Sequence, residues 1–115
     1  MLFSLELIKD GLFVRLEGEF DLLVADKLRD EINKALKKSA ARHLILDFSK
    51  LTFIDSSGLG VILGRYRQLA PMGGKVTIIG SNSQVYKILE LSGLTRVITV
   101  EEPIKDRIAR LKEEI

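Results

Sequence analysis

The polar residues Asp55, Ser56 and Ser57 lie between an apolar run and a segment with helical periodicity. Asp and Ser are preferred at helix N-caps, because their side-chain oxygens accept hydrogen bonds from the first free N–H groups of a helix. Capping needs only one such residue, which leaves a hydroxyl for another role. A helix N-terminus attracts anions through its free N–H groups and its dipole, so a serine hydroxyl there could carry a phosphate group.

Glycines continue this segment at Gly58, Gly60 and Gly64, although each glycine in a helix interior costs about 1 kcal/mol relative to alanine. Such small residues leave the backbone N–H groups uncovered and allow a partner to approach closely. Gly60 and Gly64 are four residues apart and therefore share a helix face on which another backbone could pack. The segment thus predicts a helix N-terminus that is open to a ligand or a partner.

Catalytic and nucleotide-binding motifs do not fit these residues. The spacing from Gly58 to Gly64 is one residue too long for a dinucleotide fingerprint, and no Gly-Lys-Ser/Thr triplet forms a P-loop. A nucleophile elbow requires glycine where Ile54 stands, and His43 is the only histidine available for a serine triad. With one histidine and no cysteine, the chain lacks a recognisable set of metal ligands. We expect no enzyme activity, metal or cofactor, and keep a small nucleotide-binding or phosphate-binding domain as the alternative.

The composition is that of one ordinary globular domain spanning residues 1–115. Apolar residues make up 46% and charged residues 30% of the chain, and the net charge is +2. This charge, without a dense basic run and interleaved aromatic residues, argues against direct nucleic-acid binding. No run approaches about 18 apolar residues and the N-terminus lacks the features of a signal peptide, so we expect a cytoplasmic protein without a membrane partner.

Hydrophobic periodicity predicts a regular succession of strands and helices. Apolar alternation on both sides of a turn at residues 9–11 predicts an N-terminal hairpin, and Asp21 is expected to cap the helix that follows. The expected strands cover residues 2–8, 12–17, 43–48, 75–80 and 96–100, and the expected helices cover residues 22–39, 57–69, 82–91 and 103 onwards. Strands separated by helices pair in parallel through right-handed crossovers. We therefore expect an α/β fold, with a mixed, mostly parallel β-sheet of about five strands and about four α-helices packed against it.

The segment FIDSSGLGVILGRYRQL, residues 53–69, resembles the signature of the anti-sigma factor antagonists within the STAS (sulfate transporter and anti-sigma factor antagonist) domain family. Three further blocks, GEFD, RHLILDFSKLTFIDSSG and LELSGLTRVI, resemble other blocks of that family. The resemblance spans residues 7–100 and is greatest to the sporulation antagonists of spore-forming bacteria. It implies a single STAS domain without catalytic activity of its own.

The resemblance also implies a partner switch. Antagonists of this kind bind an anti-sigma factor that is also a serine kinase, and a sigma factor is released. The kinase phosphorylates the first serine of the motif, here Ser56, and the phosphorylated antagonist lets go until a serine phosphatase resets it. We expect the added charge to act locally, with little refolding. A STAS module in a stress-signalling complex is a further alternative.

By the same resemblance, the expected partner-binding residues are Asp21, Asp55, Ser57, Gly58, Leu59 and Gly60. Asp55 could cap the helix or hold the Ser56 hydroxyl in position for the kinase. The sporulation antagonists often carry histidines after the first of these acids, whereas this chain has Leu22-Leu23-Val24, which makes the rim more apolar. Arg65 and Arg67 could form an exposed basic edge or simply lie on solvated helix faces.

Overall fold

An antiparallel hairpin begins the chain, as the apolar alternation predicted. In the computed structural model, which describes residues 2–114, β1 (Leu2–Ile8) pairs with β2 (Gly11–Phe20). Along β2 the side chain of Val14 is fully buried, whereas the adjacent Arg15 is exposed. Because successive side chains of a strand point to opposite faces, the hairpin turns one face to the core and the other to solvent.

The sheet has the strand order β1-β2-β3-β4-β5, so strands that follow one another in the sequence are neighbours in space. β3 (His43–Ile54), β4 (Lys75–Ile79) and β5 (Thr99–Val100) are parallel to β2, whereas β1 is antiparallel to it. The expected mixed, mostly parallel sheet of five strands is therefore confirmed. The carboxyl ends of the parallel strands lie at one edge, where the polar motif follows β3.

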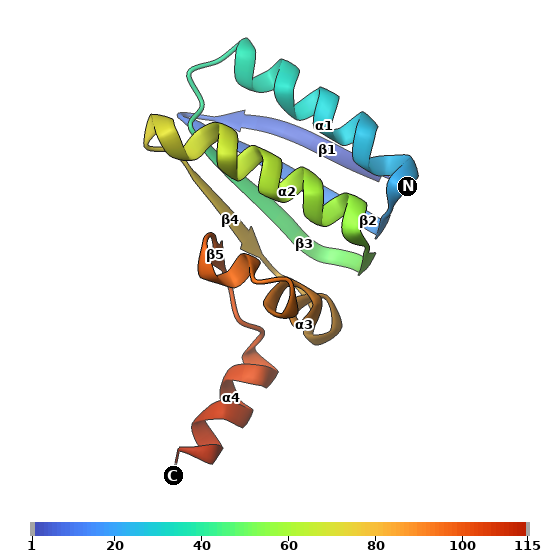
Figure 1. The fold of residues 1–115 in the computed structure, drawn as a ribbon, viewed down its shortest axis with the longest axis vertical. Helices are drawn as coiled ribbons and strands as arrows, with labels where there is room; N and C mark the ends of the chain where they lie inside the picture. The colour runs from blue at the N-terminus through green and yellow to red at the C-terminus, as the bar shows by residue number, and fades with distance from the viewer. Residues whose placement is uncertain (1, 115) are drawn as a thin grey trace.

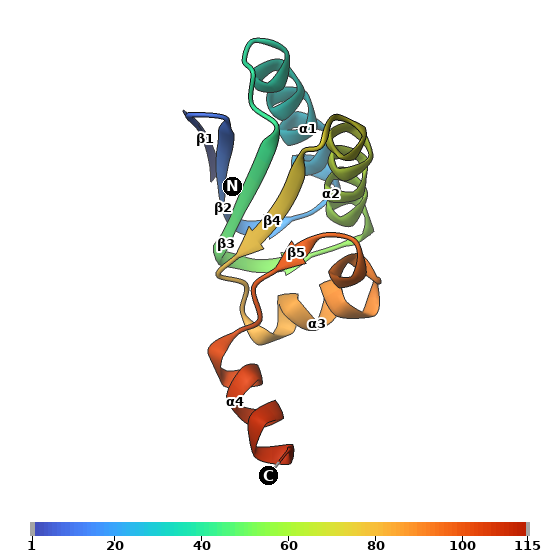
Figure 2. The same cartoon turned by 90° about the vertical axis from the view of Figure 1, so that its left-hand side faces the viewer.

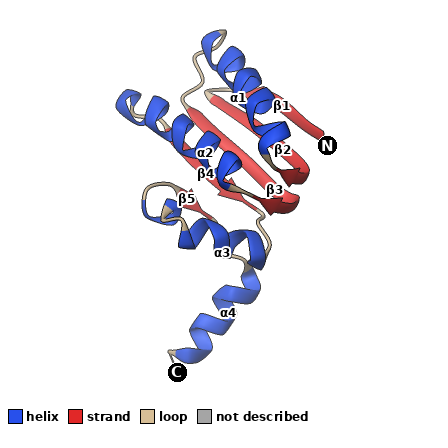
Figure 3. Ribbon diagram, turned by 45° about the vertical axis from the view of Figure 1, so that its right-hand side comes forward, coloured by secondary structure: helices blue, strands red, loops and turns tan. Residues whose placement is uncertain are grey.

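Two helices, α1 (Leu22–Lys37) and α2 (Ser56–Leu69), cover one face of the sheet (Figures 1 and 3). Their apolar side chains join those of the central strands in one buried core. Within this core the rings of Phe20 and Phe48 meet edge to face, with their centroids 6.4 Å apart. The shorter helix α3 (Ser83–Leu91) follows β4 and packs near the end of β3.

The opposite face of the sheet carries charged side chains. Arg15 on β2 and Asp47 on β3 form an ion pair with 3.0 Å between Arg15 Nε and Asp47 Oδ2, and Asp47 is buried. Burial raises the pKa of Asp47, but the hydrogen bonds from Ser49 and the guanidinium of Arg15 outweigh it and hold this pKa below its ordinary value. The pair links two central strands on the side away from α1 and α2.

The C-terminal helix α4 (Ile104–Glu113) extends away from the sheet (Figures 1 and 2). All its side chains are exposed except that of Asp106, which is half-buried. The apolar side chain of Ile104, for example, is 70% exposed. The Ser83 hydroxyl on α3 donates a hydrogen bond of 2.7 Å to Asp106 Oδ1. A polar contact therefore joins α3 and α4, and the apolar side chains of Ile104, Ile108 and Leu111 on α4 are exposed.

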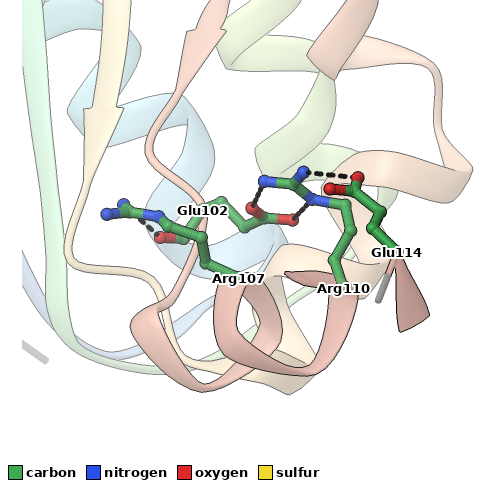
Figure 4. A network of polar contacts seen from close by, with 4 residues as sticks. All are labelled: Glu102, Arg107, Arg110 and Glu114. Carbon is green, nitrogen blue, oxygen red and sulfur yellow. Dashed lines mark hydrogen bonds and ion pairs between the residues drawn. The ribbon is translucent and has the colours of Figure 1, made fainter. Parts of the chain in front are cut away.

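A second polar network fixes the segment that leads into α4 (Figure 4). Arg110 lies 2.8 Å from the carboxylate of Glu102 and 3.5 Å from that of Glu114, and Arg107 donates a hydrogen bond to the backbone carbonyl of Glu102. The hydrogen bond from Arg110 lowers the pKa of the Glu102 carboxyl. Arg107, Arg110 and Glu114 are exposed and Glu102 is half-buried, so the network orients α4 without contributing a buried core.

The segment after α3 differs from the predicted strand at 96–100. Leu94–Arg96 form a 3-10 turn, and strand pairing is limited to Thr99–Val100. Gly93 has a left-handed φ of 85°, which turns the chain out of α3, and the N–H of Val97 then donates a hydrogen bond of 3.1 Å back to the turn. The apolar residues of this segment therefore belong mainly to a turn and not to a long strand.

β2 and β3 also extend further than predicted, because both continue past the interruption in the apolar pattern. β3 continues through Ser49 and Lys50 to Ile54, and the register between the two strands shifts at this point. An extra residue at a strand irregularity bends the strand without ending it. The extension matters for the site, because it brings the end of β3 level with Phe20 at the end of β2.

Candidate functional site

The ends of β2 and β3 place two helix N-termini side by side. Phe20 lies opposite Ile54 at the end of the parallel pair, and the N–H of Asp55 donates a hydrogen bond of 3.3 Å to the Phe20 carbonyl. Each strand leads into its helix through a single residue, Asp21 before α1 and Asp55 before α2. The parallel pairing therefore brings both helix entrances to one edge of the sheet.

The two aspartates cap these helices in the same way. Asp21 Oδ1 accepts hydrogen bonds from the N–H groups of Leu23 and Val24, at 3.1 and 3.3 Å. Asp55 Oδ1 accepts from the N–H groups of Ser57 and Gly58, at 2.9 and 3.3 Å. The predicted caps are confirmed.

Both capping residues share the extended backbone conformation with φ of −110° and ψ of −174°. Within the described residues, the hydrogen bonds of the Asp55 side chain run to backbone N–H groups and not to the Ser56 hydroxyl. Capping is therefore the role of Asp55 that the geometry supports.

Of the two serines of the motif, Ser56 is exposed and Ser57 is half-buried. Ser56 is the first residue of α2, one position later than a cap and one position earlier than the predicted helix start. The N–H of Ser57 is engaged by Asp55. Solvent exposure therefore distinguishes the hydroxyl of Ser56 as the more accessible one at the α2 N-terminus.

Packing explains why position 58 is a glycine, which the sequence alone did not reveal. A Cβ at this position would lie 2.8 Å from Ile54 Cγ1 and 2.9 Å from Phe20 Cγ, and Gly58 is buried. Real Cβ atoms do not approach other heavy atoms so closely, so only glycine lets the first turn of α2 pack on the strand ends. Gly58 therefore has an internal packing role, and the contact of a partner with it stays a prediction.

Gly60 and Gly64 have no such internal constraint. A Cβ at either position would meet nothing within 4 Å, and Gly60 is exposed. The expected close approach of another backbone to these glycines does not occur within the described chain. Their missing side chains leave the outer face of α2 bare.

A groove opens along this bare face, between α2 and the turn after α3. Its volume is about 400 Å³, and its lining contains no charged side chain. The lining residues are Ser56, Leu59, Gly60, Leu63, Ser92, Gly93, Leu94 and Val97. Those beyond Gly60 were missed by sequence reasoning. Val97 in particular was placed in the strand predicted at residues 96–100. The Ser92-Gly93 pair, which marks the end of α3, was the available signal.

Further apolar side chains are exposed at the N-terminus of α1 and at the groove. Leu22 and Leu23, on the first turn of α1, are 64% and 87% exposed, and Val97 at the groove is 46% exposed. Isolated exposed leucines are common, but two adjacent ones on the first turn of α1 form an apolar patch that is available for interaction. The apolar rim that the sequence predicted at Leu22 and Leu23 is therefore confirmed as exposed.

The arginines of α2 behave differently from each other. Arg67 is exposed, whereas Arg65 is half-buried, and its Nε and Nη1 atoms have no hydrogen-bond partner within the described residues. Burial, and next the neighbouring Arg29, lower the pKa of Arg65. The two arginines therefore do not form the exposed basic edge that was one expectation.

Other features of the described residues do not lead to a catalytic centre. A larger groove of about 900 Å³ lies between α3 and α4, but Ser56 and the two caps do not line it. Residues 2–114 contain no group of three or more His, Asp or Glu side chains arranged to hold a metal ion. No helix in this range is long and apolar enough to cross a membrane. The uncharged groove beside Ser56 also offers no cation for a nucleotide phosphate.

The chain is similar to known proteins of one family. The family model described as the STAS domain matches residues 3–110. The anti-sigma F factor antagonist of Paenibacillus polymyxa is 38% identical over 89 residues, which cover 77% of this chain and 76% of the relative. That of Lysinibacillus sphaericus is 31% identical over 111 residues, covering 94% and 95%.

Solved structures show the same fold. The anti-sigma factor antagonist SpoIIAA in its unphosphorylated form superposes with a TM-score of 0.78, at 30% identity and 97% coverage of both chains. The Bacillus cell fate determinant SpoIIAA in its phosphorylated form gives 0.71, at 30% identity and coverage of 96% and 99%. The chain belongs to the STAS domain family.

Proposed function

We propose that this STAS domain is an anti-sigma factor antagonist whose binding surface surrounds the N-termini of α1 and α2. It binds an anti-sigma factor, so that a sigma factor is released, and phosphorylation of Ser56 ends the complex. The exposed Ser56 hydroxyl at the start of α2, beside the capped start of α1, carries the proposal. The names of the curated relatives, and the existence of phosphorylated and unphosphorylated SpoIIAA structures, support it.

The chemistry of the switch belongs to the partner proteins, and the chain has no catalytic activity of its own. The anti-sigma factor acts as a serine kinase in the cytoplasm and transfers the γ-phosphoryl group of ATP to Ser56 Oγ. The O–P bond forms, the bond from the γ-phosphorus to the ADP oxygen breaks, and a base of the kinase takes the hydroxyl proton. A serine phosphatase later hydrolyses the phosphoester with water and restores the hydroxyl.

The surroundings of Ser56 allow the charge to change while the fold stays the same. A phosphoserine carries about −1.5 to −2 charges. The positive dipole ends of α1 and α2 attract this charge, whereas the carboxylates of Asp21 and Asp55 oppose it. Because the first N–H groups of α2 are already bound to Asp55, the phosphate does not need to rebuild the helix entrance.

A partner meets this surface through its exposed parts. Leu59 and Gly60 line the groove beside Ser56. Asp21, Asp55 and Ser57 are half-buried and lie at the two helix N-termini. A phosphate at Ser56 therefore lies inside the contact area. A loss of only about 2.8 kcal/mol of binding free energy weakens affinity about a hundredfold.

The test combines modification with binding. The chain is incubated with the cognate anti-sigma factor and ATP, and the phosphorylated residue is located by mass spectrometry, with Ser57→Ala as the matched control for Ser56→Ala. We expect phosphate on the wild type and on Ser57→Ala only. In a binding assay, Ser56→Ala should stay bound and Ser56→Asp should bind poorly. Phosphate on Ser57, or equal binding of the two Ser56 variants, contradicts the proposal.

A further inference from the structure

The groove beside Ser56 is a short apolar channel along one face of α2. Its α2 residues, Ser56, Leu59, Gly60 and Leu63, recur at three and four positions and therefore line one side of the helix. From Ser56 to Leu63 they span eight residues, and the seven steps between them correspond to about 10 Å of helix. Ser56 is the first of them, so its hydroxyl lies at one end of the channel.

The other wall of the groove comes from the turn after α3. Leu94 is buried and gives this wall a fixed apolar base, whereas Val97 is 46% exposed and is available for contact. Neither wall contributes a lysine, arginine or histidine to the lining. A charged group placed at the Ser56 end thus has no countercharge within the groove.

We propose that this groove receives an uncharged apolar side chain of the anti-sigma factor, and that phosphate at Ser56 releases the partner because the charge would have to be dehydrated at the end of the filled groove. This inference rests on the proposed function and names the chemistry of the contact. The uncharged lining and its continuity with Ser56 support an apolar occupant rather than a charged one.

Dehydration and repulsion predict different effects for a positive charge at position 56. An unpaired charge of either sign is costly to remove from water into apolar surroundings. Repulsion by acidic groups of the partner would instead penalise a negative charge and reward a positive one. The sign dependence at position 56 therefore separates the two mechanisms.

The experiment uses two pairs of variants with similar shapes. Ser56→Asp is compared with Ser56→Asn, and Ser56→Lys with Ser56→Met, by measuring the affinity of each full-length variant for the anti-sigma factor. We expect the charged member of each pair to bind about tenfold more weakly than its neutral counterpart, or worse. Thermal unfolding of all four variants checks that the fold is intact. Equal or tighter binding of Ser56→Lys than of Ser56→Met overturns dehydration as the mechanism.

A second experiment tests whether the groove receives an apolar side chain. Val97→Ala is compared with Ile8→Ala, because Ile8 is 51% exposed and lies on the N-terminal hairpin, outside the groove. We expect Val97→Ala to weaken binding about fivefold or more, and Ile8→Ala to leave it unchanged. Wild-type affinity in both variants contradicts the proposal that the groove receives an apolar side chain of the partner. Failure of the unphosphorylated wild type to bind at all would instead refute the proposed function, so the two failures are distinguishable.

Discussion

Alanine at the glycines of α2 should change stability in opposite directions, according to the face each glycine occupies. At Gly58 a new Cβ would lie 2.8 Å from Ile54 Cγ1 and 2.9 Å from both the ring and the carbonyl oxygen of Phe20. The carbonyl is backbone and cannot move without shifting the end of β2. At Gly60 and Gly64 the new methyl group would meet nothing within 4 Å.

The magnitudes follow from two opposing effects. Replacing glycine by alanine in a helix interior stabilises by about 1 kcal/mol. Overpacking a well-packed site costs about 1 to 3 kcal/mol. At Gly58, in the first turn, the propensity gain is smaller than in the interior, so we expect a net loss of about 1 to 2 kcal/mol. At Gly60 and Gly64 the packing cost is absent, and each alanine should stabilise the chain by about 1 kcal/mol.

Urea unfolding of the three single variants measures these effects directly. The midpoint for Gly58→Ala should fall, whereas the midpoints for Gly60→Ala and Gly64→Ala should rise without a change in the slope. Thermal unfolding should agree, with a shift of about 4 °C for each kcal/mol. A neutral or stabilising Gly58→Ala would refute the argument that this glycine is required by the contact with the strand ends.

The same variants separate stability from binding. Gly60 lines the groove beside Ser56, whereas Gly64 does not, although both lie on α2 and both have open space around them. Gly64→Ala is therefore the matched control. We expect Gly60→Ala to weaken binding of the anti-sigma factor while raising stability, and Gly64→Ala to raise stability alone. Equal binding by the two variants would show that the partner does not approach α2 at Gly60.

Two further predictions concern the helix entrances and the paired carboxylate of the sheet. Asp21→Ala and Asp55→Ala should each lower the free energy of unfolding by about 1 kcal/mol, because each removes the acceptor for two N–H groups, and urea unfolding measures the loss. A cost confined to one of them would contradict the equivalence of the two caps. Since folding lowers the pKa of Asp47, its contribution is present above the unfolded pKa near 3.8 and is lost as the pH falls through the lower folded value. Asp47→Asn should therefore lose less stability between pH 7 and acid than the wild type does, and parallel losses would contradict this assignment.

Local signals predicted the elements that position the site. Asp21 and Asp55 each precede a helical pattern, and capping depends on a few adjacent residues, so both helix starts could be predicted without tertiary information. The parallel order of the strands followed from the alternation of strands and helices. That both caps lie at one edge of the sheet is seen in the structure, where β2 and β3 end side by side.

The parts that escaped prediction depend on contacts between distant segments. The reason for Gly58 lies in Phe20, which is far away in the sequence and becomes a neighbour only when β2 and β3 pair. The groove wall at Leu94 and Val97 depends on a turn, whereas the apolar composition of this segment predicted a strand. Periodicity reports which face of an element is buried, but not which element covers it.

The alternation of faces along α2 explains how a switch can operate next to a core without disturbing it. Gly58 and Ile62 face inward and are buried, whereas Ser56 and Gly60 face outward along the groove. A change at Ser56 therefore alters the contact surface, while the packing of α2 on the strand ends is set by side chains on the other side of the helix. Because Asp55 already satisfies the first N–H groups, the helix entrance does not depend on the phosphate for its hydrogen bonds. On the proposed mechanism, a partner is released by a local change in hydration while the scaffold that presents the Ser56 hydroxyl keeps its shape.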